Sequence, residues 1–276
     1  MKRLNIFIII IFIIGGIFIT KGTIDIVSAK SDSESNIKNQ ELIQNENLTE
    51  IEQNYTKTNE VQKENSINKE QIAEEQKYNI KQTVDKEYFN DALFIGDSRT
   101  VGISEYGDLN NATFFANPGM SVYNVFDKNI SVPKVGKLKL KDLLTSKQYG
   151  KVYVMLGINE LGYNINKTLE NYKKLLEYIE NTQKNAIIYV EANLHVTEEK
   201  SKKDKIINNE NIDKFNNEIS KLADNKKIFY IDINEKFDDK SGNLSSEYTK
   251  DNVHIYAKHY KEWSNWLTQN AIKKGG

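Results

Sequence analysis

Three side chains in this sequence are of the types needed to attack a carbonyl carbon. Ser98 follows Gly96 and Asp97 directly after a short apolar run, and Asp251 precedes His254 by three residues near the end of the chain. A serine hydroxyl is a weak nucleophile until a base removes its proton, and the ordinary pKa of histidine lies close to neutrality. Asp251 can orient the imidazole and stabilise its charged form. These residues predict nucleophilic attack by Ser98, with His254 as the base.

Such an attack also needs hydrogen-bond donors for the negative charge that develops on the carbonyl oxygen. Losing one of these donors typically lowers the rate by about 10²- to 10³-fold. Three donors follow separate apolar runs: the backbone N–H of Ser98, the backbone N–H of Gly119 in an Asn-Pro-Gly turn, and the side-chain amide of Asn159 in a Gly-Ile-Asn sequence. We expect these three groups to form an oxyanion hole.

Each motif also has a purely structural interpretation. A Gly-Asp-Ser sequence after a strand is commonly a turn that caps a helix, and an isolated Asp-x-x-His is commonly a solvated surface turn. Gly119 can be part of an ordinary Pro-Gly turn, and Asn159 can be a loop residue that caps its neighbours. The motifs fill complementary roles in one reaction, and this agreement favours the chemical interpretation.

Short apolar runs precede these motifs and have the length and composition of buried strands. Segments with helical periodicity lie between them. Strands that alternate with helices form a parallel sheet covered on both faces, and such sheets bind ligands beyond the carboxyl ends of their strands. The sequence therefore predicts an α/β fold with the motifs at one edge. The expected strands are 92–95, 113–116, 152–156, 186–190 and 228–231, and the expected helices are 168–183, 209–225 and 260–272.

Taken in order, the motifs resemble the blocks of the SGNH hydrolase superfamily, also called GDSL-like lipases and esterases. Ser98 matches the serine of block I, Gly119 the glycine of block II, Asn159 the asparagine of block III, and Asp251 with His254 the Asp-x-x-His of block V. The resemblance covers roughly residues 90–272. It implies a three-layer α/β/α sandwich with a five-stranded parallel sheet in flavodoxin-like order. It also implies a Ser-His-Asp triad without metal or cofactor, and the oxyanion hole described above.

Two residues depart from the family pattern. Arg99 replaces the leucine of the eponymous motif, and Glu160 replaces the aspartate that often follows the block III asparagine. The Gly-Asp-Ser-Arg variant is similar to a subgroup found in surface proteins of clostridia and their relatives. Arg99, Glu160 and His195, which follows the fourth expected strand, are candidate substrate contacts. The alternatives are that Arg99 pairs with Asp97 or Glu160, and that His195 stabilises a loop.

The first residues of the sequence predict a membrane-inserting segment. Two basic residues precede the apolar stretch 4–20, whose length suits either a retained anchor or a cleaved signal. The basic residues favour an N-terminus on the inside, so the remaining chain would face outward in both cases. Residues 30–86 contain neither Gly nor Pro and are rich in polar residues, which predicts a largely disordered stalk. The expected divisions are 1–29 for the membrane segment, 30–86 for the stalk and 87–276 for the catalytic domain.

The composition narrows the chemistry further. With 38 Lys and Arg against 39 Asp and Glu, the formal net charge is −1, which argues against nucleic acid as a partner. The chain has no cysteine, so thiolate zinc sites and a cysteine nucleophile are excluded. Its three histidines lack the spacing of zinc ligands, and we expect no metal and no cofactor.

Together these observations predict an extracytoplasmic serine esterase that removes O-acyl groups, chiefly acetyl, from a carbohydrate or cell-envelope polymer through an acyl-enzyme. The polymer is inferred from the location that the N-terminal segment predicts. Two alternatives remain open. One is an O-acyltransferase that uses the same triad to pass the acyl group to a glycan hydroxyl, and the other is a catalytically silent envelope-binding protein. Product analysis with an acyl donor and a glycan acceptor separates transfer from hydrolysis.

Overall fold

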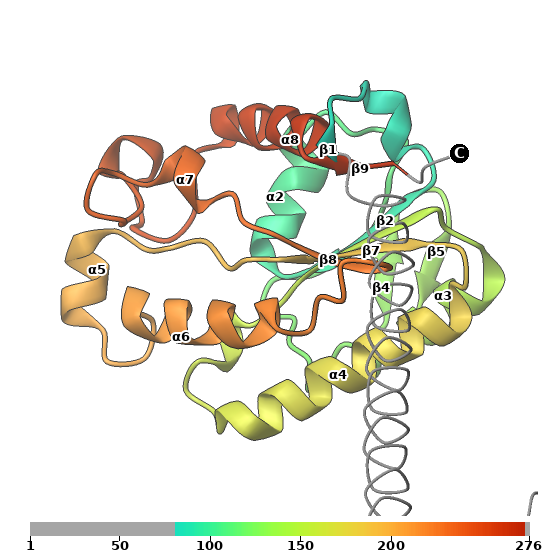
Figure 1. Cartoon of the computed structure of the whole chain (residues 1–276), viewed down its shortest axis with the longest axis horizontal. Coiled ribbons are helices and arrows are strands. Elements are labelled where there is room, and N and C mark those ends of the chain that lie inside the picture. Colours follow the sequence, from blue (N-terminus) through green and yellow to red (C-terminus); the bar gives the residue numbers. More distant parts are fainter. Residues whose placement is uncertain (1–80, 274–276) are drawn as a thin grey trace, which may run out of the picture. The chain divides into compact units, whose positions relative to one another are not determined.

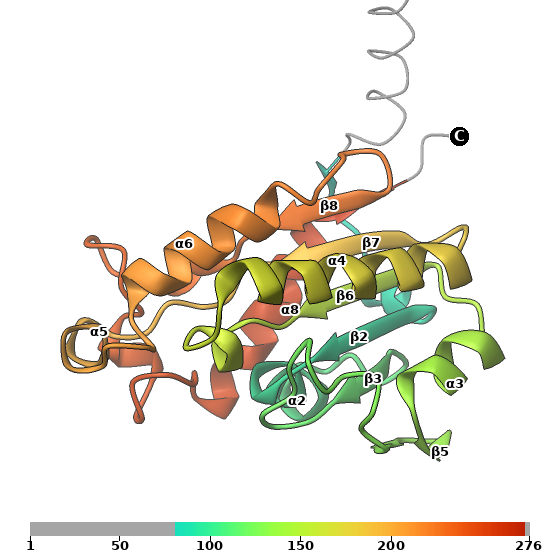
Figure 2. The same cartoon turned by 90° about the horizontal axis from the view of Figure 1, so that it is seen from below.

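The computed structural model describes residues 81–273, which are built around a five-stranded parallel sheet. The strand order across the sheet is β3-β2-β6-β7-β8 (Figure 2), and Figure 1 shows the same sheet lying between its helices. Numbered along the chain within this sheet, the order is 2-1-3-4-5, which is the flavodoxin-like arrangement. The predicted fold class and strand positions are confirmed. The strands are β2 (Ala92–Gly96), β3 (Thr113–Ala116), β6 (Lys151–Met155), β7 (Ile187–Glu191) and β8 (Ile228–Ile231).

Both faces of the sheet are buried, which explains why its strands are continuous apolar runs rather than alternating ones. In β2, Leu93 and Ile95 belong to the core on one face, while Phe94 belongs to the core on the other. The second core contains a row of stacked rings that crosses four neighbouring strands. Successive ring centroids lie 5.0, 4.4 and 4.3 Å apart, from Phe114 through Phe94 and Tyr153 to Tyr189. Full burial of one large side chain contributes about 1.5–3 kcal/mol, so this row helps to fix the register of the sheet.

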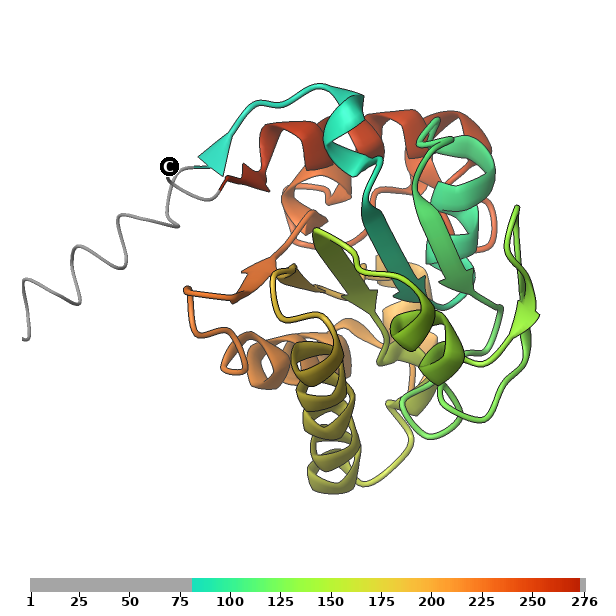
Figure 3. The same ribbon diagram turned by 90° about the vertical axis from the view of Figure 1, so that its right-hand side faces the viewer.

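Helices cover the two faces and complete three layers (Figure 3). On one face, α3, α4 and α6 supply buried leucine, isoleucine and aromatic side chains, and on the other face α2 and α8 do so. The amphipathic spacing seen in the sequence produces α4, α6 and α8 because their apolar stripes pack on the sheet. The bounds are α2 (Ser98–Tyr106), α3 (Leu140–Ser146), α4 (Ile165–Thr182), α6 (Asn209–Ser220) and α8 (Tyr260–Gln269).

Helix α6 ends five residues before the predicted end at 225. The cause is a turn built on Asp224, whose Oδ1 accepts hydrogen bonds of 2.8 Å from the backbone N–H groups of Lys226, Lys227 and Ile228. An aspartate side chain that satisfies three successive N–H groups gives the backbone an alternative to further helix. The turn leads directly into β8. Shorter elements that were not predicted are the hairpin β4 (Ile130–Val132) and β5 (Gly136–Leu138), with α5 (Glu198–Lys203) and α7 (Asn234–Phe237).

The folded domain begins earlier than the predicted boundary at 87. Strand β1 (Lys81–Gln82) pairs antiparallel with β9 (Ala271–Ile272), and the N–H of Val84 donates to the carbonyl of Thr268 at 2.9 Å. The last helix, predicted over 260–272, therefore ends at Gln269, and the chain then forms the short strand β9. The membrane segment 1–29 and the stalk as far as residue 80 lie outside the described residues. Within 81–273, no helix has the length and apolar character needed to cross a membrane.

The ends of the described chain lie at the amino edge of the sheet. The Tyr88 hydroxyl donates to the carbonyl of Ile272 at 2.6 Å, and the carbonyl of Tyr88 accepts a hydrogen bond of 2.8 Å from Lys151, the first residue of β6. Figure 2 shows the strand arrows pointing the other way, toward the side that carries α5. The motifs singled out in the sequence follow the strands and therefore occupy the carboxyl edge, opposite β1 and β9.

Candidate active site

The structure brings Ser98, His254 and Asp251 into one hydrogen-bonded chain. The Oγ atom of Ser98 lies 2.8 Å from Nε2 of His254, and Nδ1 of His254 lies 2.7 Å from Oδ2 of Asp251. Ser98 is the first residue of α2, directly after β2, and Asp97 caps this helix by accepting a hydrogen bond of 2.9 Å from the Arg99 N–H. The tight strand-to-helix junction leaves the serine hydroxyl partly exposed at the carboxyl edge of the sheet.

A turn stabilised by the Asp251 side chain places both Asp251 and His254. Oδ1 of Asp251 accepts hydrogen bonds from the N–H groups of Val253 at 3.0 Å and His254 at 2.7 Å. Partial burial alone would raise the pKa of Asp251, but these hydrogen bonds, together with the one from the His254 ring, lower it to about 2. The loop after β7 holds the turn, because the Thr197 hydroxyl donates to Oδ1 of Asn252 at 2.9 Å. The carboxylate beside the imidazole is thus ionised at neutral pH.

The three predicted oxyanion donors come from separate loops at the same edge. The N–H of Ser98 has no acceptor within α2, because it belongs to the first helical residue. Gly119 is exposed and has a φ of +71°, a left-handed conformation that disfavours residues with a side chain. Among residues 81–273, the Gly119 N–H has no backbone acceptor. Nδ2 of Asn159 donates one hydrogen to the carbonyl of Met120 at 3.0 Å, which leaves its second hydrogen for a ligand.

Glu160 lies beneath the oxyanion loops and faces away from solvent. Its side chain is buried, and Oε1 accepts a hydrogen bond of 2.7 Å from the N–H of Val122. This bond and the one from Asn159 to Met120 connect the loop after β3 with the loop after β6. Burial raises the pKa of Glu160 to about 7, although the hydrogen bond from Val122 opposes this shift. Its position favours a role in positioning Gly119 and Asn159 and does not support the expected substrate contact.

Arg99 is also buried, with only 1% of its surface exposed. Its Nη1 lies 3.9 Å from Oδ2 of Asp97, and its Nη2 lies 3.5 Å from the carbonyl of Leu194. The guanidinium therefore packs behind the serine, where a substrate group cannot reach it. Of the two expected pairings, the structure shows the one with Asp97.

His195 lies in the loop after β7, but both nitrogens of its ring are hydrogen-bonded to carboxylates. Nδ1 lies 2.7 Å from Oδ2 of Asp238 and Nε2 lies 2.9 Å from Oδ1 of Asp213. Burial would lower the pKa of His195, but the hydrogen bonds and charges of Asp238 and Asp213 raise it to about 9. The ring therefore donates to both carboxylates as a charged imidazolium. This geometry favours the loop-stabilising interpretation over a hydrogen bond to substrate.

Buried asparagines that belong to none of the sequence motifs hold the same loop. Oδ1 of Asn193 accepts a hydrogen bond from the N–H of Ile158 at 3.0 Å, and Oδ1 of Asn216 accepts one from the N–H of Asn193 at 2.8 Å. Asn209 bonds both backbone groups of Val196, at 2.8 and 2.9 Å. Asparagines on the inward face of α6 could have indicated these contacts from the sequence, because a buried side-chain amide needs hydrogen-bond partners.

Comparison with known proteins agrees with this arrangement. Residues 94–261, more than half of the chain, match the GDSL-like Lipase/Acylhydrolase family. The chain belongs to this family. The enzyme is accordingly a serine hydrolase of the SGNH type, as the sequence motifs predicted. No curated protein matches the sequence. Among residues 81–273, no group of three or more His, Cys, Asp or Glu side chains is placed to hold a metal ion.

Solved structures share the fold of this GDSL-like hydrolase. A protein from Streptococcus pneumonia described as a platelet activating factor is 23% identical, with a TM-score of 0.50 over 74% of this chain and 94% of the other. A GDSL-like lipase from Bacteroides thetaiotaomicron is 16% identical, with a TM-score of 0.50 over 68% of this chain and 89% of the other. At these identities the similarity supports the α/β fold alone.

Proposed function

We propose that the enzyme is an extracytoplasmic esterase that removes O-acyl groups, chiefly acetyl, from a carbohydrate or cell-envelope polymer, with Ser98 as its nucleophile. The main support for this proposal is the chain of two short hydrogen bonds from Ser98 through His254 to Asp251. The imidazole accepts from one side the proton that the serine must lose, and a carboxylate stabilises the resulting charge from the other side.

The reaction then proceeds in two steps. His254 removes the proton from Oγ of Ser98 as this oxygen attacks the ester carbonyl. The N–H groups of Ser98 and Gly119 and the amide of Asn159 stabilise the oxyanion. His254 next protonates the departing alcohol, which leaves an acyl group on Ser98. A water molecule gives a proton to His254 and attacks the acyl carbon. His254 then returns this proton to Oγ of Ser98 as the bond between Oγ and the acyl carbon breaks and the carboxylic acid leaves.

The cavity beside the loop of Asn159 supports a substrate without a long acyl chain. The cavity, lined by Glu160 and Tyr163, has a volume of about 140 Å³, whereas pockets that enclose larger organic ligands typically reach about 300–1,000 Å³. Polar groups contribute much of its lining, including Thr168, Asn211 and Lys214. A long acyl chain placed in this cavity would leave these groups without hydrogen-bond partners.

The extracytoplasmic location is supported by the sequence of residues 1–20. The basic start and the apolar stretch 4–20 predict membrane insertion with the remaining chain outside.

The full chain should hydrolyse p-nitrophenyl acetate and release acetate from an acetylated polysaccharide, and Ser98→Ala should lose both activities. The control is p-nitrophenyl palmitate, which should react far more slowly than the acetate. Equal acetate release by wild type and Ser98→Ala would contradict the proposed nucleophile. Fast hydrolysis of the palmitate without release of acetate from the polysaccharide would contradict the proposed substrate.

A further inference from the structure

Exposed apolar side chains gather around the rim of the catalytic edge. Among residues 81–273, six large hydrophobic side chains are exposed, and four of them lie in loops that follow the carboxyl ends of the sheet strands. Single exposed hydrophobic residues are ordinary on protein surfaces, whereas their concentration beside an active site indicates a binding surface. The four rim residues are Tyr123 after β3, Tyr163 after β6, Ile206 after β7 and Tyr256 after β8.

Tyr123 and Tyr163 form a stacked pair next to the oxyanion loops. Their ring centroids are 5.1 Å apart, with planes inclined by 30°, and the Tyr123 hydroxyl lies 3.0 Å from Oγ1 of Thr168. Tyr123 is four residues after Gly119, and Tyr163 is four residues after Asn159. Tyr163 is 62% exposed despite the stacking, so much of its ring is available to a ligand.

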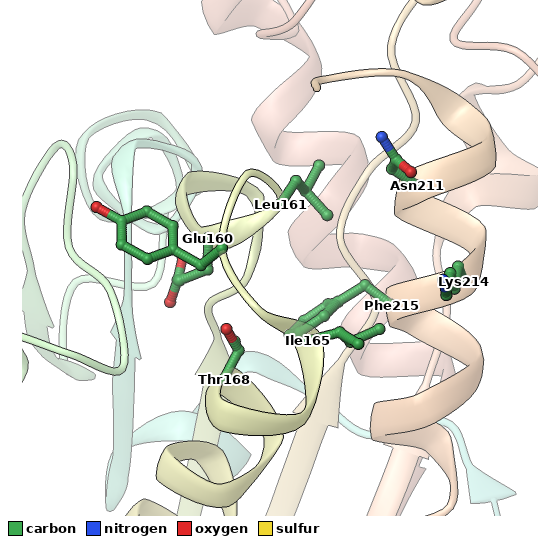
Figure 4. Close-up of a pocket in the computed structure, with 8 residues that line it drawn as sticks. Glu160, Leu161, Ile165, Thr168, Asn211, Lys214 and Phe215 are labelled. Carbon is green, nitrogen blue, oxygen red and sulfur yellow. The ribbon is translucent and has the colours of Figure 1, made fainter. Parts of the chain in front are cut away.

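A cavity lies between the loop that carries Tyr163 and the helix α6 (Figure 4). Its apolar side chains come from the loop, the start of α4 and α6, while amide, hydroxyl and ammonium groups complete the lining. The lining residues are Glu160, Leu161, Tyr163, Ile165, Thr168, Asn211, Lys214 and Phe215.

This combination fits a sugar ring better than it fits an acyl chain or a phosphate. Aromatic faces carry partial negative charge and attract the C–H groups of a pyranose, while the hydroxyls of the sugar can bond with Asn211 and Lys214. A fatty acyl chain offers no partner for these polar groups. A phosphate would find one ammonium group beside a buried carboxyl, which is a poor anion site.

We propose that Tyr123, Tyr163 and the cavity beside them form a subsite for one sugar ring, which holds the alcohol part of the ester while Ser98 attacks the acyl part. The subsite rests on the proposed esterase function, because it assigns the group to which the acyl unit is attached. Glu160 connects the two regions, because its Oε1 accepts a hydrogen bond from Val122 in the loop of Gly119 and the residue also lines the cavity.

The test compares an ester of a sugar with an ester that lacks one. The full-length chain and Tyr163→Ala are assayed with mono-O-acetylated methyl glucoside and with ethyl acetate. The variant should lose roughly tenfold in kcat/KM for the sugar ester and change less than about twofold for ethyl acetate. Tyr163→Phe, which keeps the ring, should behave like the wild type with both esters. Equal losses with both esters, or no loss with either, would overturn the subsite.

A second measurement separates failure of the subsite from failure of the esterase. In the Ser98→Ala background, binding of the same acetylated glucoside is followed by saturation-transfer NMR with and without Tyr163→Ala. Binding that Tyr163→Ala abolishes supports the subsite even if the wild type hydrolyses neither ester, in which case only the esterase proposal fails. Binding that is absent, or unchanged by Tyr163→Ala, contradicts the subsite independently of any turnover.

Discussion

Two histidine–aspartate pairs lie at the carboxyl edge of the same sheet, and they differ in the partner on the far side of the ring. In both, Nδ1 is 2.7 Å from a carboxylate oxygen, of Asp251 for His254 and of Asp238 for His195. Nε2 of His254 faces the hydroxyl of Ser98 at 2.8 Å, whereas Nε2 of His195 faces a second carboxylate, that of Asp213, at 2.9 Å.

This difference separates a base from a structural cation. An imidazole between a carboxylate and a hydroxyl can take up and return one proton, because its Nε2 is free to accept. An imidazole between two carboxylates donates from both nitrogens and stays charged, which agrees with the pKa of about 9 for His195. A His–Asp pair at the carboxyl edge is therefore insufficient evidence of a catalytic base, and the group that faces Nε2 decides its role.

The largest expected effect separates the two histidines directly. His254→Gln should lower kcat for p-nitrophenyl acetate by about 10⁴-fold or more, because glutamine cannot accept the serine proton. His195→Gln should leave kcat within about threefold, since its ring already binds two carboxylates. The measurement is steady-state kinetics on folded full-length variants checked by circular dichroism. Comparable losses of kcat in the two variants would contradict the assignment of His254 as the base and of His195 as a structural cation.

The carboxylates provide the next test. Asp251→Asn should lower kcat by about 10²- to 10⁴-fold, because an amide no longer stabilises the imidazolium or fixes its tautomer. The backbone hydrogen bonds from Val253 and His254 can persist in this variant, so the turn should keep its shape. Asp238→Asn serves as the matched control at the other histidine and should leave kcat unchanged. A larger loss of kcat in Asp238→Asn than in Asp251→Asn would contradict these roles.

The stability of the domain should depend on pH through His195. Its pKa of about 9 in the folded protein lies above the ordinary value of 6.5, so the folded state binds this proton more tightly than the unfolded chain does. The stabilisation is complete below pH 6.5 and is lost as the pH rises through about 9. Allowing for solvent screening at Asp213, we expect a loss of about 1–2 kcal/mol. Thermal unfolding from pH 6 to 10 should show this decline in wild type and a flatter profile in His195→Gln.

The smallest effect distinguishes the two carboxylates around His195. The Asp213 side chain is 59% exposed and that of Asp238 is 12% exposed. Asp213→Asn should therefore cost no more than about 0.5 kcal/mol of unfolding free energy, and Asp238→Asn about 2 kcal/mol. Urea denaturation at pH 7 measures both. A larger loss for Asp213→Asn would mean that the exposed carboxylate is the main partner of the imidazolium.

The sequence allowed the sheet and the grouping of Ser98, Gly119, Asn159 and His254 to be predicted, because both depend on local patterns joined by one topological rule. Apolar runs define the strands, and parallel strands place the residues that follow them at one edge. The roles of Arg99, Glu160 and His195 could not be predicted from such local patterns. These roles depend on where each side chain points and on hydrogen-bond partners that are distant in the sequence. The β1–β9 pairing is only two residues long and leaves no periodic signal.

Covalent labelling with a fluorophosphonate, read by mass spectrometry of the digested full-length protein, shows whether Ser98 is the nucleophile that His254 activates. Such a probe transfers its phosphonyl group to an activated serine and releases fluoride. We expect one adduct, on the peptide that contains Ser98, in the wild type and in His195→Gln. His254→Gln should give little or no adduct, and Ser98→Ala none. An adduct on another residue, or undiminished labelling of Ser98 in His254→Gln, would contradict these roles of Ser98 and His254.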